Sequence, residues 1–97
     1  MKYEIVWLVE ALSELEAIKS YIEQDNPSAA TKLIDQLLKR VRQLAEMPGM
    51  GHVDEEVSEF RNTVVRPNYN IFYRVEEKTR TVFIAHIWHS ARSKKGL

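Results

Sequence analysis

The last third of the chain holds the residues whose types could act on a phosphate. Arginine can hold a phosphate through two parallel hydrogen bonds, and histidine can move a proton near neutral pH. Together such groups could bind a nucleic-acid backbone or stabilise the charge that develops during RNA cleavage. The basic residues of this region that could serve are Arg61, Arg66, Arg74, Arg80, His86, His89 and Arg92.

The distribution of charge points to the same region. The 97 residues have a formal net charge of zero, but residues 1–60 carry six Lys or Arg and twelve Asp or Glu. Residues 61–97 carry eight Lys or Arg and only two acids. A basic region of this kind could contact an anionic partner, or it could be the solvated side of antiparallel strands. Charge alone leaves both interpretations open.

One stretch of this region, RPNYNIFYRV from Arg66 to Val75, predicts a β-strand because apolar and polar residues alternate. One face would carry Tyr69, Ile71, Tyr73 and Val75. The other face would carry Asn70, Phe72 and Arg74. This second face is either an ordinary solvated surface or a surface that meets a partner.

The aromatic side chains of this region also have two interpretations. Tyr69, Phe72, Tyr73 and Trp88 could stack on a nucleobase, or they could pack in the core. Tyr73 shares its predicted face with Ile71 and Val75, which favours the core. For Phe72 the alternation leaves both roles open.

Several other chemistries are not supported. The chain has no cysteine, which excludes disulfides and thiolate chemistry. His52, His86 and His89 lack the spacing that two metal-binding histidines usually have on a helix or strand. No phosphate loop, dinucleotide fingerprint or nucleophile elbow occurs, and the acids between positions 54 and 59 are expected to be a solvated loop. We therefore expect no metal and no cofactor.

The first half of the chain predicts a short strand followed by a helical hairpin. Residues 3–7 form an apolar strand candidate. Residues 10–24 place Leu12, Leu15, Ile18 and Ile22 at helical spacing, with Ala11 and Tyr21 alongside. Asn26 and Pro27 suit the start of a second helix, because Asn caps free N–H groups and Pro tolerates the first helical position. Its apolar stripe consists of Ala30, Leu33, Ile34, Leu37, Leu38, Val41, Leu44 and Ala45. MPGMG, at residues 47–51, ends this helix.

The second half predicts three strands at residues 60–66, 69–76 and 81–89, with a turn at residues 77–80. The fold class is therefore α+β, as one domain over residues 1–97: a strand, an antiparallel helical hairpin, and a three-stranded antiparallel meander. The hairpin covers one sheet face, and no further element is left to cover the other. Asn70, Phe72 and Arg74 should project from that face.

The start of the chain carries no targeting or membrane signal. MKYEIVWLVEAL has acids at Glu4 and Glu10 and no long apolar run, so we expect neither a signal peptide nor a membrane span. The absence of cysteine suits a reducing compartment. We expect a cytoplasmic protein.

Several segments together resemble the ParE/RelE superfamily of toxins from type II toxin–antitoxin systems. They are NPSAA, LAEMPGMG, an arginine at the start of the next strand, YNIFYRV and IAHIWHSARS, and they cover essentially the whole chain in order. The Asn-Pro helix start, the Pro-Gly-x-Gly stop, the acids after it and FYRV favour the ParE branch. The resemblance implies the strand, helical hairpin and three-strand fold. It also implies a bacterial or archaeal cytoplasmic toxin, held inactive by a cognate antitoxin in a hetero-oligomer.

The two branches of this superfamily differ in their targets. ParE-type toxins poison DNA gyrase, whereas RelE-type toxins cut mRNA in the ribosomal A site with Arg, Lys, His and Tyr residues on the open sheet face. Arg61 matches a basic position of the family, but Asn70 departs from the RelE pattern and no tyrosine follows Tyr73. His86, His89 and Arg92 could partly stand in for the missing groups.

The resemblance therefore predicts a toxin that binds and inhibits DNA gyrase and is not an enzyme. The alternatives are a RelE-like, ribosome-dependent mRNA endoribonuclease and an inactive relative that only binds an antitoxin. The catalytic residues of a ribonuclease would be Arg61, Arg74, His86, His89 and Arg92. The residues expected to contact a protein partner are Asn70, Phe72, Arg74, Arg92, Lys94 and Lys95.

Overall fold

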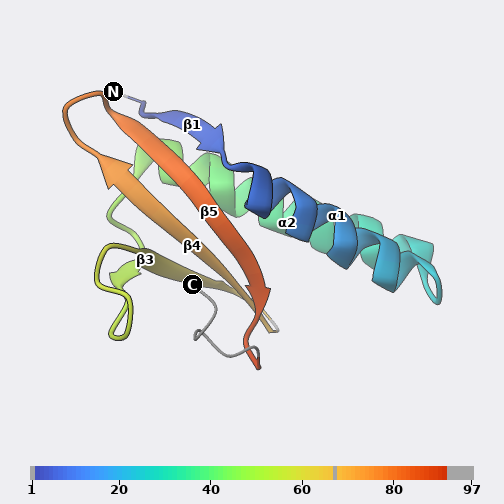
Figure 1. Ribbon diagram of the computed structural model, residues 1–97. Coiled ribbons are helices and arrows are strands. Elements are labelled where there is room, and N and C mark those ends of the chain that lie inside the picture. Colours follow the sequence, from blue (N-terminus) through green and yellow to red (C-terminus); the bar gives the residue numbers. More distant parts are fainter. Residues whose placement is uncertain (1, 67, 92–97) are drawn as a thin grey trace.

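A computed structural model of the chain describes residues 2–66 and 68–91. The elements in chain order are β1 (Glu4–Trp7), α1 (Val9–Glu23), α2 (Pro27–Glu46), β2 (His52–Val53), β3 (Arg61–Val65), β4 (Tyr69–Glu76) and β5 (Thr81–His89) (Figure 1). The strands form one sheet in the order β1-β5-β4-β3-β2. The predicted α+β class and order of elements are confirmed. The two-residue strand β2 was not predicted, since it lies in the polar segment expected to be a loop.

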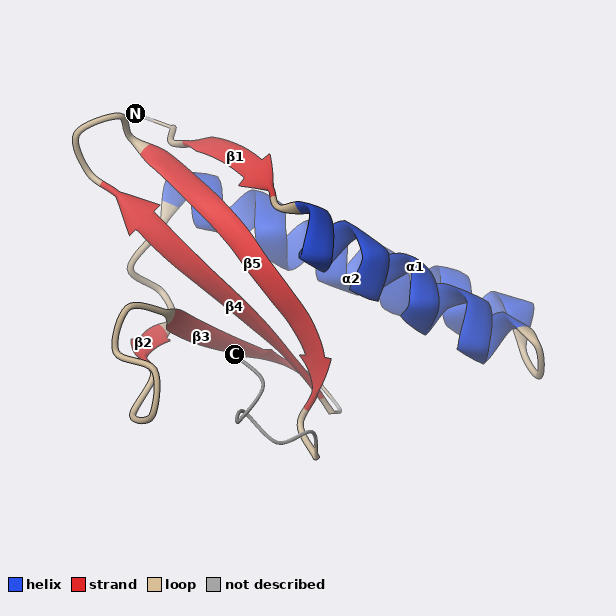
Figure 2. Cartoon of the chain, viewed as in Figure 1, coloured by secondary structure: helices blue, strands red, loops and turns tan. Residues whose placement is uncertain are grey.

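The helical hairpin forms for the local reasons that the sequence suggested. The Asn26 side chain accepts a hydrogen bond from the Ala29 backbone N–H at 3.1 Å, and Pro27 opens α2. In α1 the fully buried residue is Ala11, whereas Leu12, which was expected on the stripe, is 44% exposed. The apolar stripe of α1 therefore runs through Ala11, and Leu12 lies at its margin. Both helices cover the same face of the sheet, and the tip of the hairpin extends past the sheet edge (Figure 2).

The core lies between this hairpin and one face of the sheet. Its fully or nearly fully buried members are Ala11, Leu33, Leu37, Val41, Leu44, Val65, Ile71, Tyr73, Val82, Ile84 and Ile87. The predicted inward face of β4 is confirmed, because Ile71 and Tyr73 are inaccessible to solvent and Tyr69 and Val75 pack beside them. Tyr73 is thus a core residue and not a surface for stacking.

The three-stranded meander contains a β-bulge. Phe72 pairs with His86, but the next residue, Tyr73, pairs with Ile84, so Ala85 is an extra residue on β5. The bulge explains how Ile84 and Ile87, three positions apart, both face the core. After the bulge, His86 and His89 lie on opposite faces of β5, as their odd spacing predicts.

The sheet is asymmetric at its edge beside β5. β1 runs parallel to β5 and pairs only with residues 81–84, so no strand among the described residues lies beside the outer edge of β5 beyond that point. Within the described residues, the face opposite the hairpin carries no helix (Figure 2). We call it the helix-free face. No helix in the described part of the chain is long and apolar enough to cross a membrane.

Candidate functional site

Four aromatic rings form a closed ring of contacts on the helix-free face. The centroid distances are 6.5 Å for Phe60–Phe72, 5.7 Å for Phe72–Trp88, 5.1 Å for Trp88–His86 and 6.1 Å for His86–Phe60. We call these four residues the aromatic cluster. Phe72 and Trp88 are only 2% and 3% exposed. Phe72 lies on the predicted face, but the expectation that it projects to solvent is wrong, because Phe60 and the neighbouring rings cover it.

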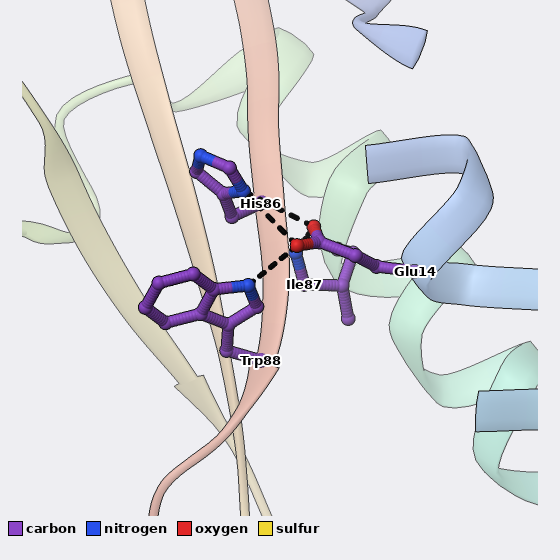
Figure 3. A network of polar contacts seen from close by, with 4 residues as sticks. All are labelled: Glu14, His86, Ile87 and Trp88. Carbon is purple, nitrogen blue, oxygen red and sulfur yellow. Dashed lines mark hydrogen bonds and ion pairs between the residues drawn. The ribbon is translucent and has the colours of Figure 1, made fainter. Parts of the chain in front are cut away.

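A carboxylate from α1 holds this cluster from the edge of the sheet. Glu14 accepts hydrogen bonds from the Trp88 indole Nε1 at 2.5 Å, the Ile87 backbone N–H at 3.0 Å and His86 Nδ1 at 3.1 Å (Figure 3). It can do so because β1 has ended, which leaves the Ile87 N–H at an open edge. The sequence analysis did not find Glu14. Its signal was an acid three residues after Ala11 and four before Ile18, within the apolar stripe of α1.

The contact with Glu14 fixes how His86 can act. A carboxylate is an acceptor only, so a hydrogen of His86 lies on Nδ1, and in the neutral imidazole the lone pair is on Nε2. Figure 3 shows the second ring nitrogen pointing away from Glu14. A carboxylate that orients an imidazole in this way is the arrangement of a general base. His86 is therefore the one predicted catalytic residue that the described structure provides with an orienting carboxylate.

Four polar side chains form a continuous chain of hydrogen bonds across the rest of the helix-free face. Ser90 Oγ donates to Asn70 Oδ1 at 2.8 Å, Asn70 Nδ2 donates to Asn62 Oδ1 at 2.8 Å, and Asn62 Nδ2 donates to Asp54 Oδ1 at 3.3 Å. Asp54 is 2% exposed, and its Oδ2 accepts from the backbone N–H groups of Glu56 and Val57. The acidic loop is therefore not solvated throughout, because Asp54 anchors it to the sheet.

A groove lies on the other side of the sheet, between α2 and the ends of β3 and β4. It has a volume of about 610 Å³, with Ile22, Leu33 and Tyr69 among its apolar lining and Lys32 and Arg66 as its basic groups. A second hollow of about 460 Å³ continues it, sharing Arg66 and adding further basic groups from α2. This groove offers apolar contacts between positive charges.

Comparison with known proteins gives the family. Residues 5–94 match the family described as "ParE toxin of type II toxin-antitoxin system, parDE". The chain belongs to the ParE toxin family. The predicted resemblance to the ParE/RelE superfamily is confirmed, and the chain is a toxin of the type II toxin–antitoxin class.

Two curated proteins and several solved structures are similar to this ParE-family toxin. The chain is 37% identical over 89 residues to "Toxin RelE2" of Caulobacter vibrioides, covering 92% of this chain and 97% of that protein. It is 30% identical over 82 residues to "Putative toxin Y4kP" of Sinorhizobium fredii, covering 84% and 85%. The fold matches a chain of the chromosomal ParDE system of P. aeruginosa with a TM-score of 0.76 at 22% identity, covering 91% and 96%. It also matches a free mutant form of E. coli toxin RelE with a TM-score of 0.72 at 19% identity, covering 97% and 90%.

This ParE-family fold does not bring the predicted catalytic residues together. Arg61 pairs with Tyr73, which faces the hairpin, and its Nη1 donates to the Gly51 carbonyl at 2.9 Å. His89 lies on the same side, edge-on to Tyr69 at 5.4 Å. The remaining two described candidates, Arg74 and His86, lie on the helix-free face. Arg74 stacks over the ring of its neighbour Phe83, with its guanidinium carbon 4.6 Å from the ring centre.

The other predicted residues of this ParE-family toxin have varied positions. Asn70 is on the predicted face, half-buried, and bound to Asn62 and Ser90. Arg66 is exposed at the groove, and Arg80 is exposed in the turn before β5. Arg92, Lys94 and Lys95 lie outside the described residues. Among the residues that the structure describes, no group of three potential metal ligands occurs.

Proposed function

We propose that this type II toxin acts by binding and inhibiting DNA gyrase, and that a cognate antitoxin neutralises it. The observation that carries the proposal is the division of the basic residues between two faces. Arg61 and His89 lie on the hairpin side of the sheet, whereas Arg74 and His86 lie on the helix-free face. RNA cleavage requires phosphate-binding and proton-transfer groups within hydrogen-bonding reach of one reacting centre. Of the four described candidates only Arg74 and His86 share a face, so the set of residues predicted for a ribonuclease is divided.

The burial of the aromatic cluster supports a protein target over a nucleotide. Recognition of single-stranded RNA uses exposed aromatic rings on which unstacked bases can lie. Phe72 and Trp88 are too buried to present such a surface. Val64 is 47% exposed on the same face, beside its cross-strand partner Asn70, which is half-buried. An exposed aliphatic side chain beside a half-buried amide suits a protein–protein contact.

The groove beside α2 supports the antitoxin part of the proposal. Its apolar walls and its basic groups, Lys32 and Arg66, suit an acidic chain with apolar anchors that becomes ordered on binding. A structural neighbour belongs to a ParDE toxin–antitoxin system, which accords with such a partner. The predicted hetero-oligomer with an antitoxin is part of this proposal.

A second candidate function is mRNA cleavage on the ribosome. One observation favours it: Glu14 orients His86 so that Nε2 can accept a proton. The relative named RelE2 is consistent with this branch. In this case His86 would be the base, and Arg74 would be the described arginine on the same face. His89 and Arg61 would not contribute.

The two functions can be separated with purified components. For a gyrase inhibitor, supercoiling of relaxed plasmid should fall with added toxin, cleaved DNA complexes should accumulate, and mRNA in a translating extract should stay intact. A ribonuclease should instead cut the mRNA, and His86→Ala should abolish the cutting while Arg61→Ala leaves it. Intact supercoiling together with site-specific mRNA cleavage would overturn the gyrase proposal. A protein that does neither, and does not slow growth when expressed without an antitoxin, would be an inactive relative.

A further inference from the structure

Glu14 belongs to the helix layer but acts on the opposite face of the sheet. Its three hydrogen-bond donors come from three consecutive residues of β5, namely His86, Ile87 and Trp88. Two of the donors are side chains of the aromatic cluster, on the helix-free face. The carboxylate reaches them around the edge of β5 that β1 leaves open (Figure 3).

Burying the Glu14 carboxylate at this position of α1 is energetically unfavourable unless hydrogen-bond donors surround it. Its side chain is 18% exposed and lies beside the apolar stripe that packs on the sheet. Removing a carboxylate from water is unfavourable, and hydrogen bonds to charged groups compensate for the loss. The three donors provide that compensation, so an apolar group in place of the carboxylate would leave all three donors without an acceptor.

We propose that Glu14 is the positioning residue of the toxic surface: it fixes Trp88 and His86, and through them sets the shape of the helix-free face. Phe72 and His86 both rest on the Trp88 ring, and Phe60 closes the cluster over them. If the indole lost its acceptor, this second layer of packing would loosen while the core under the hairpin kept its contacts. The inference rests on the proposed function only in taking the helix-free face as the surface that acts on the target.

The test compares Glu14→Gln with Glu16→Gln, a matched loss of charge at an exposed position of the same helix. Glutamine keeps the size of the side chain and one acceptor oxygen, but it turns the other oxygen into a donor. The NMR resonance of the Trp88 indole N–H reports whether the bond is lost, and a Trp7→Phe background leaves Trp88 as the only indole. Growth arrest on expression measures toxicity without assuming a target. Affinity for the product of an adjacent small gene, taken as the antitoxin, reports on the groove beside α2, on the other side of the sheet.

We expect Glu14→Gln to move the Trp88 indole resonance upfield and to raise the toxin level needed for growth arrest about tenfold, the effect of losing one charge-assisted hydrogen bond. Antitoxin affinity should stay within about twofold, since packing distant from the change contributes independently. Glu16→Gln should match the wild type in all three measurements. Trp88→Phe should lower toxicity to a similar degree, and the double variant should be no worse than the stronger single variant.

Other outcomes decide against the inference. If the resonance moves but toxicity is unchanged, Glu14 holds Trp88 without serving the activity. If toxicity and antitoxin binding fall together, Glu14 supports the whole fold and not one surface. Additive losses in the double variant would show that Glu14 does not act through Trp88. A wild-type toxin that arrests growth without affecting gyrase would overturn the proposed target and leave this test of Glu14 intact, whereas a wild type without toxicity would overturn both.

Discussion

Arg40 of α2 donates a hydrogen bond from Nη1 to the backbone carbonyl oxygen of Val64 at 2.8 Å, at the free edge of β3. β2 pairs only with Arg61 and Asn62, so in the part of the chain that the structure describes the rest of β3 has no strand neighbour on that side. Glu14 makes the corresponding contact with the Ile87 N–H at the opposite edge of the sheet. A charged side chain from each helix thus protects one open edge, where unpaired backbone groups would otherwise template pairing with another chain.

Replacing Arg40 with leucine should therefore promote self-association. The variant removes the donor from the Val64 carbonyl and from Thr63 Oγ1, which Arg40 also contacts at 2.7 Å. Sedimentation velocity and light scattering during heating should show oligomers that the wild type does not form. Arg42→Leu, at an exposed position of the same helix, controls for the loss of charge. Equal self-association of both variants would mean that net charge, and not protection of the β3 edge, keeps copies of the protein from associating.

Leu37→Ala should be strongly destabilising. Leu37 is fully buried at the centre of α2, so its truncation removes apolar contacts and leaves a cavity. We expect a loss of about 2–5 kcal/mol in the free energy of unfolding, a large share of what a domain of this size has. Urea unfolding followed by circular dichroism measures it. The neighbouring Leu38 is only partly buried, so Leu38→Ala should cost less, and a loss below about 1 kcal/mol at Leu37 would contradict its place in the core.

The two glycines of the segment after α2 should respond differently to alanine. A Cβ at Gly51 would lie 2.7 Å from both the Asn62 carbonyl oxygen and the Tyr73 hydroxyl, whereas nothing lies within 4 Å of one at Gly49. Gly51→Ala should cost about 1–3 kcal/mol through overpacking, while Gly49→Ala should be neutral or mildly stabilising. Thermal unfolding of the two variants side by side checks this difference. Equal melting temperatures would mean that the segment can move away from β4 without loss.

The Tyr73 hydroxyl should make the folding stability fall as the pH rises in the alkaline range. It donates to the Pro48 carbonyl at 2.8 Å and accepts from the Gly51 N–H at 2.9 Å, and burial raises its pKa above the ordinary value of 10.0. The folded state thus prefers the protonated hydroxyl. Its contribution is fully present below pH 10 and is lost as the pH rises through the raised pKa.

Tyr73→Phe provides the control for this pH dependence. The variant should lose about 1–3 kcal/mol at neutral pH, because the Gly51 N–H and the Pro48 carbonyl lose their partner in a buried place. It should also lose the part of the alkaline destabilisation that Tyr73 causes. Urea unfolding of both proteins between pH 8 and 11 makes the comparison. Parallel curves for the two proteins would show that other groups cause the alkaline loss.

Val64→Asp should weaken the action on gyrase without unfolding the protein. Val64 is 47% exposed on the helix-free face, so the new charge stays hydrated in the free toxin but would be buried against a partner. We expect the concentration that half-inhibits supercoiling to rise about tenfold or more, since interface substitutions at well-packed positions cost over 1 kcal/mol. Val53→Asp is the matched control, since Val53 is 50% exposed and pairs with Arg61 on the other face. An equal effect of both substitutions would contradict the proposal that the helix-free face is the surface that contacts gyrase.

Much of the fold followed from periodicity within single elements. Alternation in β4 separated Ile71 and Tyr73 from Asn70 and Phe72, and the odd spacing of His86 and His89 placed them on opposite faces. The cap at Asn26 and the stripe through Leu37 gave α2 and its buried side. These predictions succeeded because a side chain's direction on a helix or strand depends only on local backbone geometry. The family resemblance used the same local signals, read over the whole chain.

Contacts between elements could be found only in the tertiary structure. Glu14 meets His86, 72 positions later in the chain, because β1 ends partway along β5. The register of β3 on β4 put Arg61 on the hairpin side, away from His86, and so divided the predicted catalytic set. Periodicity gives the face a side chain takes on its own element, but not which element lies against that face. The sequence by itself therefore determined the elements other than β2, most of their inner faces and the toxin family. Strand register and the point where each strand ends decided which of the polar residues meet.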